Sequence, residues 1–150
     1  MPSPAPGPRP RATRIADTLT RLTTDHDCWL ATAGTEGAWL VPLSFIWHDQ
    51  RIVMATGSRS RVVSDVALRS RVRLAVGPTR DVVILDGTAT TMPVSDIEDE
   101  VVQEFARKLS TDPREWAGTL VVVTPTRIQA WREENELEGR EIMSAGVWLD

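Results

Sequence analysis

The first half of the chain constrains the fold most, because it alternates strand-like runs with short turns. The runs are Cys28–Ala33, Ala38–Trp47 and Arg51–Thr56. The glycine-bracketed residues 34–37 join the first two runs, and His48-Asp49-Gln50 joins the second to the third. Such connections are typical of antiparallel hairpins. Meandering strands with few helices between them favour a closed barrel, since closure leaves no exposed sheet edge.

The segment Gly57-Ser58-Arg59-Ser60-Arg61 follows the third run directly and leads into an amphipathic helix. The N–H groups of a first helical turn are free to donate to an anion, and the helix dipole favours negative charge there. Arginine adds a planar fork that matches phosphate oxygens. The sequence therefore predicts that Ser58, Arg59, Ser60 and Arg61 bind a phosphorylated ligand at the start of this helix.

The other elements follow from hydrophobic periodicity and turn signals. We expect helices over residues 13–23 and 95–109, and further strands over residues 72–76, 81–90, 120–124 and 127–131. Ser95 and Glu98 form a capping box at the start of the second of these helices. Pro125 is expected at a corner between the last two strands. The predicted fold class is mainly β, a barrel of six to seven antiparallel strands with about three peripheral helices.

Proline marks two further places in the chain. It occupies every even position from 2 to 10, which predicts a disordered tail over residues 1–12 and one domain over residues 13–150. Pro42, which cannot donate to a strand ladder, marks an edge, a bulge or a corner where the backbone faces a ligand. Residues 132–150 read as polar and irregular. The hydrophobic side chains in that segment that are available for docking are Ile142, Met143, Val147 and Trp148.

Composition narrows the class of protein and its partners. The net charge of −4 argues against a general nucleic-acid binder, yet residues 51–80 hold seven arginines and one acid, Asp65. That local excess suits an anionic ligand, although a solvated basic face is the alternative. No apolar stretch is long enough for a secretory signal or a membrane span, so we expect a cytoplasmic protein without a membrane partner. The single Cys28 is expected to be a small buried hydrophobic residue.

The sequence offers few groups for acid–base chemistry. His26 and His48 are the only histidines, neither has metal-ligand spacing, and tyrosine is absent. We therefore assign no catalytic residue and no metal, and expect His48 to be an exposed turn residue. An enzyme with this composition takes its reactivity from a bound redox cofactor. Trp131 is the tryptophan best placed to cover a planar heterocycle, because it ends a strand at the predicted barrel rim.

Four segments in order match a known family pattern. They are residues 37–45 (Gly-Ala-Trp-Leu-Val-Pro-Leu-Ser-Phe), residues 52–56 (Ile-Val-Met-Ala-Thr), residues 58–61 (Ser-Arg-Ser-Arg) and residues 71–74 (Arg-Val-Arg-Leu). Over residues 15–131 the chain resembles the pyridoxamine 5′-phosphate oxidase-like, FMN-binding split-barrel proteins. It looks closest to the small actinobacterial branch that includes deazaflavin-dependent reductases.

The resemblance implies a split-barrel homodimer with one FMN in each of two clefts between the subunits, and it makes residues 13–150 an FMN-binding domain. It places Pro42, Leu43 and Ser44 against the flavin, and Thr56, Ser60 and Arg61 at the phosphate. Arg61 stands where the family usually has lysine, which keeps the charge. Asp65 replaces a frequent asparagine. The substrate-binding arginine and histidine of the oxidase itself are not recognisable.

These observations predict an FMN- or deazaflavin-dependent oxidoreductase that transfers hydride or electrons to or from a small organic substrate. The predicted cofactor-binding residues are Pro42, Leu43, Ser44, Thr56, Ser58, Arg59, Ser60, Arg61 and Trp131. The cofactor is FMN or, alternatively, the 8-hydroxy-5-deazaflavin coenzyme. The expected partners are a second copy of the chain and a small molecule, with no nucleic acid and no membrane. Two alternatives stay open: a non-catalytic flavin- or haem-binding module, and a structural dimer whose site has decayed because Asp65 lies near the arginines.

Overall fold

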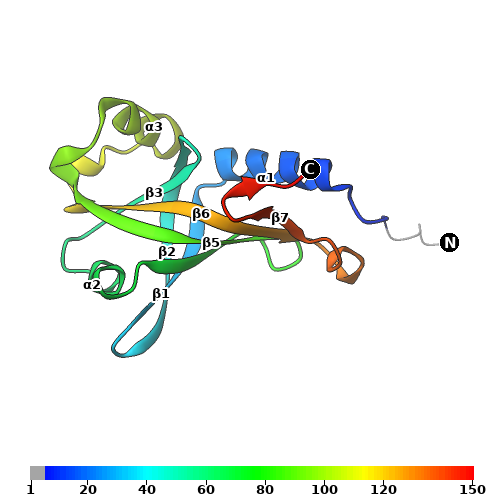
Figure 1. The fold of residues 1–150 in the computed structure, drawn as a ribbon. Helices are drawn as coiled ribbons and strands as arrows, with labels where there is room; N and C mark the ends of the chain where they lie inside the picture. The colour runs from blue at the N-terminus through cyan, green and yellow to red at the C-terminus, as the bar shows by residue number, and fades with distance from the viewer. Residues whose placement is uncertain (1–5) are drawn as a thin grey trace.

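The computed structural model describes residues 6–150, which form an antiparallel sheet closed into a barrel (Figure 1). The strand order is β3-β2-β1-β4-β5-β6-β7-β8, and an additional pairing of β3 with β6 closes the first six strands. The strands are β1 (Asp27–Gly34), β2 (Gly37–His48), β3 (Arg51–Thr56), β4 (Arg71–Val76), β5 (Val82–Pro93), β6 (Thr119–Trp131), β7 (Glu141–Ser144) and β8 (Val147–Trp148). The predicted fold class is confirmed.

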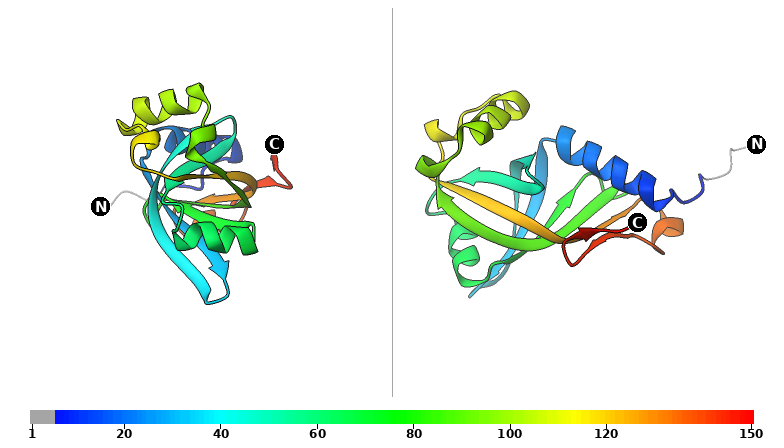
Figure 2. Two further views of the ribbon diagram at one scale, coloured as in Figure 1. Left: turned by 90° about the vertical axis from the view of Figure 1, so that its left-hand side faces the viewer. Right: turned by 45° about the horizontal axis from the view of Figure 1, so that its top comes forward.

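Three α-helices flank the barrel: α1 (Arg11–Thr24), α2 (Arg61–Leu68) and α3 (Asp99–Leu109). Figures 1 and 2 show α1 and α3 on one side of the barrel and α2 on the opposite side. Short 3₁₀ turns occupy Val94–Asp96, Pro113–Glu115 and Glu134–Glu136. No helix of the described residues is long and apolar enough to cross a membrane.

The core fills the barrel interior and has an extension under α3. Leu30, Phe45, Leu74, Leu85 and Ile128 are fully buried in the main cluster, which also contains the predicted buried residue Cys28. Burial raises the pKa of the Cys28 thiol to about 12, as expected for a thiol that has lost its water. The smaller cluster beneath α3 is formed by Ile46, Val53, Ala55, Val101, Phe105 and Leu120. The apolar face of α3 thus fixes this helix against β2, β3 and β6.

Two predicted boundaries are wrong. Helix α3 begins at Asp99 with Glu98 as its N-cap, whereas Ser95 lies in a 3₁₀ turn. The extended backbone of Ile97 (ψ 133°) separates that turn from the helix, so Ser95 cannot cap it. Pro125 is not a corner, because β6 runs through it as one strand. Its missing N–H is accommodated at a register shift of the β5–β6 ladder next to Gly87.

The C-terminal segment is also more regular than predicted. Residues 141–148 form the β7–β8 hairpin, which extends the sheet beyond β6. Ile142 and Met143 dock into the core as expected, while Val147 stays exposed. Trp148 donates its Nε1–H to Gln50 Oε1 across 3.2 Å. This contact ties the hairpin to the β2–β3 turn.

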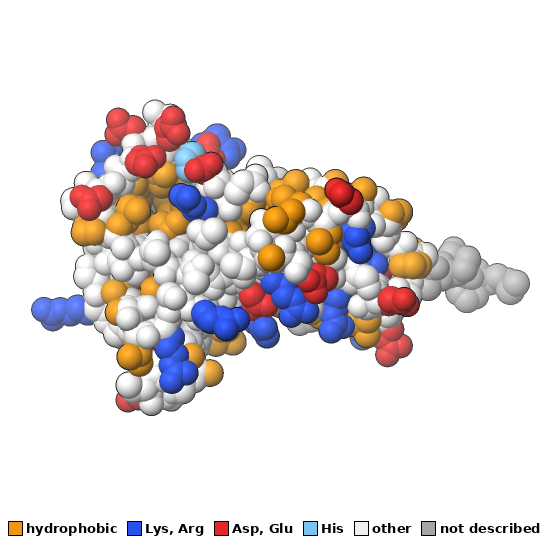
Figure 3. Space-filling model, in the orientation of Figure 1, with side chains coloured by type: hydrophobic (Ala, Val, Ile, Leu, Met, Phe, Trp, Pro, Cys, Tyr) orange, Lys and Arg blue, Asp and Glu red, His pale blue; other side chains and the backbone are white. Residues whose placement is uncertain are grey.

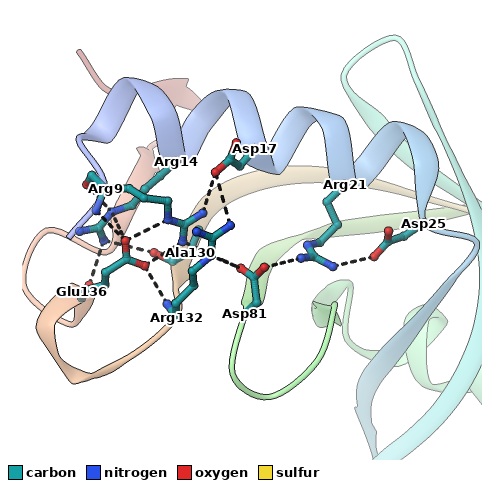
Figure 4. A network of polar contacts seen from close by, with 9 residues as sticks. All are labelled: Arg9, Arg14, Asp17, Arg21, Asp25, Asp81, Ala130, Arg132 and Glu136. Carbon is teal, nitrogen blue, oxygen red and sulfur yellow. Dashed lines mark hydrogen bonds and ion pairs between the residues drawn. The ribbon is translucent and has the colours of Figure 1, made fainter. Parts of the chain in front are cut away.

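The predicted tail over residues 1–12 needs correction in its described part. Residues 1–5 lie outside the described residues. Arg11 already starts α1, and Arg9 is held before it (Figure 4). The Arg9 guanidinium donates from Nε (2.9 Å) and NH2 (2.8 Å) to Glu136 and from NH1 to Asp17 (3.0 Å). Proline-rich composition does not prevent docking here, because one buried ion pair fixes the segment.

Candidate functional site

The turn between β3 and α2 leaves hydrogen-bonding groups free. The Ser60 N–H donates to the Gly57 carbonyl (3.1 Å), and Ser60 is the N-cap of α2 without a side-chain capping bond. Its Oγ is buried and has no hydrogen-bond partner among the described residues. A buried hydroxyl without a partner costs about 1–3 kcal/mol. This hydroxyl and the first-turn N–H groups of α2 therefore form a donor set that an anionic oxygen would satisfy.

Arg61 stands at the first position of α2 and is held on two sides. Its guanidinium carbon lies 4.3 Å from the centre of the Trp39 ring, a cation–π distance. Its NH1 lies 3.4 Å from a Glu36 carboxylate oxygen, and its Nε lies 3.8 Å from an Asp65 carboxylate oxygen. The β1–β2 hairpin and α2 together thus set the position of this side chain.

Ser58 and Arg59 occupy the tip of the same turn. The Thr119 hydroxyl donates to Ser58 Oγ across 3.2 Å, which ties the turn to the start of β6. A Cβ atom on Gly118 would come within 2.0 Å of Ser58 Oγ, so only glycine allows this approach. Arg59 is exposed and forms no ion pair with the residues that the structure describes. It remains available to a ligand at the turn.

A cleft opens where β2 and β3 separate. Their ladder ends at the pair Phe45–Met54, so the next residues of both strands are not paired with each other. Pro42, Leu43, Ser44 and Thr56 instead line a cleft of about 540 Å³. The predicted ring-binding residues and one predicted phosphate residue thus share one cavity, whose lining also includes Gly57, the residue directly before the Ser58–Arg61 turn.

The edge of β2 in this cleft carries few backbone donors. Over residues 37–44, β2 pairs with β1 alone, so its other edge is unpaired, as predicted for Pro42. The Phe45 N–H donates to the His26 carbonyl on the β1 side. Because N–H directions alternate along a strand, the Ser44 N–H points to the cleft side, and Pro42 has no N–H. The Ser44 hydroxyl donates to an Asp27 carboxylate oxygen (2.7 Å).

The opposite wall of the cleft was not predicted. It consists of Phe105 and Leu109 from α3, together with Thr111 and Trp116 from the following loop. The Trp116 ring is 56% exposed, and its Nε1–H donates to Thr111 Oγ1 (2.9 Å). The amphipathic pattern of residues 99–109 predicts an apolar face, but only the fold shows which strands it faces. Acidic side chains gather over α3 on the face shown in Figure 3.

The other predicted candidates lie apart from this cleft. Trp131 ends β6, whereas Thr119, which pairs with Thr56, begins it. Twelve residues of extended strand separate them, or about 40 Å. Within one chain the structure therefore does not bring Trp131 to the other site residues. His48 is half-buried and lies 3.9 Å from Glu100, and no group of three metal-binding side chains occurs in residues 6–150.

A closed antiparallel barrel in which two neighbouring strands part beside a helix N-terminus defines the class of split β-barrel proteins. The chain belongs to the pyridoxamine 5′-phosphate oxidase family, whose model, described as "Pyridoxamine 5'-phosphate oxidase", matches residues 17–132. The predicted family is confirmed, while the actinobacterial branch stays a prediction. None of the curated proteins matches the chain.

Solved structures share the fold at low sequence identity. A protein named F420 reductase has 14% identity and a TM-score of 0.60, covering 73% of this chain and 93% of its own. An FMN-binding, pyridoxamine 5′-phosphate oxidase-related protein from Nostoc punctiforme has 15% identity and a TM-score of 0.56, with coverages of 81% and 83%. A heme binding protein from Mycobacterium smegmatis has 20% identity and a TM-score of 0.62, with coverages of 92% and 59%.

Proposed function

We propose that this protein binds a flavin-type cofactor, FMN or the 8-hydroxy-5-deazaflavin coenzyme, and transfers hydride or electrons to or from a small organic substrate. One observation carries the proposal. The cleft lined by Pro42, Leu43, Ser44 and Thr56 also includes Gly57, directly before a turn in which a buried serine hydroxyl has no partner among the described residues. Family membership supports a flavin-type cofactor, and similar folds are named as F420 reductase and as FMN-binding.

The residues of the cleft fit the two ends of such a cofactor. Ser60 Oγ, the first-turn N–H groups of α2 and Arg61 would hold the phosphate. The Ser44 N–H would donate to a polar edge of the ring, and Phe105 and Trp116 would exclude water from its face. The bound ring supplies the redox chemistry, and the protein supplies orientation and electrostatics.

A second copy of the chain would complete the cleft. On the outer face of the barrel, Trp29 pairs across the ladder with Pro42, and Ala31 pairs with Leu40. Trp29 and Leu40 are 49% and 60% exposed, which is unusual for large apolar side chains placed side by side. We propose that this face forms a homodimer interface, through which a partner's Trp131 would be able to approach the cleft. Light scattering that shows a stable monomer at micromolar concentration would contradict the dimer.

A haem-binding module is the second candidate. His26 lies at the rim of the cleft and is the one histidine that lines it, and imidazole is a common axial ligand of haem iron. The similar Mycobacterium smegmatis structure is named as a heme binding protein.

The visible spectrum of the purified protein separates the candidates. Bands at about 370 and 450 nm indicate FMN, one band at about 420 nm indicates the deazaflavin, and a Soret band indicates haem. A colourless preparation is then titrated with each cofactor. Binding of FMN or the deazaflavin, followed by reduction of the bound ring with dithionite and reoxidation by a small acceptor, is the expected result. A protein that binds neither of these two cofactors contradicts the proposed function.

A further inference from the structure

Arg61, the proposed phosphate ligand, is already paired with two acids. Its guanidinium lies between Glu36 on the β1–β2 hairpin (3.4 Å) and Asp65 one helical turn further along α2 (3.8 Å). The two acids differ in their surroundings. The Glu36 side chain is 77% exposed, whereas that of Asp65 is 7% exposed. The charge of Asp65 is therefore screened far less by water and salt.

The Asp65 carboxylate is fixed by its neighbours in β1. The Thr32 hydroxyl donates to Asp65 Oδ2 across 2.8 Å. The other carboxylate oxygen sits against Gly34, where a Cβ atom would come within 2.1 Å of it. Glycine at this position makes the space that the carboxylate fills. Because one oxygen accepts this hydrogen bond and the other fills the space beside Gly34, the carboxylate is positioned next to Arg61.

The charges around the start of α2 cancel. Arg59 and Arg61 contribute two positive charges, and Glu36 and Asp65 contribute two negative ones. What remains for an anion is the field of the helix N-terminus, equivalent to roughly half a positive charge, and the donors of the first turn and Ser60. This is a weak field for a phosphate monoester, which carries nearly two negative charges at neutral pH.

We propose that Asp65 positions Arg61 and tunes the site for a singly charged phosphodiester over a doubly charged phosphate monoester. The inference rests on the proposed function, because it concerns the phosphate end of the same cofactor. It narrows the ligand to a ring of the flavin type whose phosphate carries a further substituent.

Three ligands with one ring test the charge preference: riboflavin, the methyl ester of FMN and FMN itself. Their phosphate ends carry no charge, one charge and nearly two charges. The wild type is expected to bind the methyl ester at least as tightly as FMN. Asp65→Asn keeps the shape and can still accept the Thr32 hydrogen bond. It should strengthen FMN binding about tenfold and methyl ester binding about threefold, since the gain in the logarithm of affinity scales with ligand charge. Riboflavin affinity should not change.

Glu36→Gln is the matched control, because it removes the same charge at an exposed position. Its effect on FMN should have the same sign but stay below about threefold. It also keeps the proposal testable if Asp65→Asn fails to fold, since no strengthening of FMN relative to riboflavin in Glu36→Gln would then overturn it. Equal changes for all three ligands in Asp65→Asn, or a gain for FMN no larger than that for the methyl ester, also overturn it.

The outcomes separate this inference from the proposed function. If the wild type binds the ligands but Asp65→Asn does not change their relative affinities, the inference fails and the proposed function stands. If the wild type binds none of them and Asp65→Asn binds FMN, Asp65 has the assigned role, and FMN is excluded as the cofactor of the natural protein. If neither protein binds any of the three ligands, the inference fails, and the titration with the deazaflavin coenzyme then decides the proposed function.

Discussion

Two clusters of arginine and acidic side chains in this protein differ in their hydrogen bonding. In the first, called here the saturated cluster, the charged groups pair with one another, whereas the second keeps polar groups that have no partner within residues 6–150. Around Glu136 the guanidinium groups of Arg9, Arg14, Arg21 and Arg132 meet the carboxylates of Asp17, Asp25, Asp81 and Glu136 (Figure 4). Arg14 in addition donates to the carbonyls of Ala130 (3.3 Å) and Glu136 (2.9 Å). At the start of α2, by contrast, the Ser60 hydroxyl has no partner among the described residues, and Arg59 is unpaired there.

The difference teaches how to tell a structural charge cluster from a ligand site. A network that satisfies its own donors and acceptors leaves nothing for a ligand, and breaking it exposes a buried charge. A cluster that keeps buried donors free needs an outside acceptor. The first cluster joins the N-terminal segment, α1 and the end of β6, and the second follows Gly57, a residue of the cleft, in the chain. Three predictions test this division, and a fourth concerns helix α3 beside the cleft.

The largest effect is expected in the saturated cluster. Arg9→Ala removes the main partner of Glu136, whose side chain is 3% exposed, and should lower the free energy of unfolding by about 3–5 kcal/mol. Urea denaturation measures this. The control is Arg80→Ala, which breaks the exposed pair with Glu133 and should cost no more than about 1 kcal/mol. Equal losses in both variants would show that the Arg9 contact is not structural.

At the start of α2 the expected effect is on binding. Arg61→Ala should weaken FMN binding roughly 10- to 150-fold, because a charge-assisted hydrogen bond contributes about 1.5–3 kcal/mol. Riboflavin, which lacks the phosphate, should be nearly unaffected in titrations of the same variant. Arg69→Ala, at the far end of α2, serves as control with little effect, since the helix-terminal field falls off within one turn. An equal loss of riboflavin binding would show that Arg61 stabilises the fold and does not bind the phosphate.

Acid should weaken the saturated cluster selectively. The hydrogen bonds from Arg9 lower the pKa of Glu136 to about 2 from the ordinary 4.5. Glu136 therefore stabilises the fold fully above about pH 4.5, and this contribution is lost as the pH falls toward 2. Comparing urea midpoints of the wild type and Glu136→Gln at pH 5 and pH 3 should show the gap between them narrowing. A gap that is constant with pH would contradict the assignment.

The smallest effect concerns α3, the helix that contributes Phe105 and Leu109 to the cleft. Lys108, the only lysine of the chain, donates to the Leu22 carbonyl (3.0 Å) and lies 3.8 Å from the Phe45 ring centre. Burial lowers its pKa to about 8 from 10.5. The unfolded chain then holds more protons than the folded one between these values, so Lys108 makes stability rise with pH from about 8 upward. Thermal unfolding of Lys108→Met at pH 8 and pH 9 should lack this rise. The comparison stops at pH 9, because deprotonation of Cys28 in the unfolded chain acts in the opposite direction above that pH.

Much of the barrel and part of the site follow from the sequence by itself. Period-two alternation and turn residues locate β1 to β5 to within a few residues, because both signals act between near neighbours in the chain. The Ser58–Arg61 turn and the start of α2 are equally local. So is the unpaired edge at Pro42, since proline lacks the N–H that an inner ladder needs.

Tertiary structure alone decides the contacts between distant segments. Arg9 and Glu136 are 127 positions apart, and no local pattern indicates that a proline-rich segment docks there. Gly34 is placed by the sequence in a hairpin, and only packing shows that it makes room for the Asp65 carboxylate. The wall that α3 gives the cleft, the strand that continues through Pro125 and the distance of Trp131 from Thr56 likewise depend on contacts between distant segments. Local propensities determine which elements form, whereas burial, register and charge pairing between those elements determine where their side chains meet.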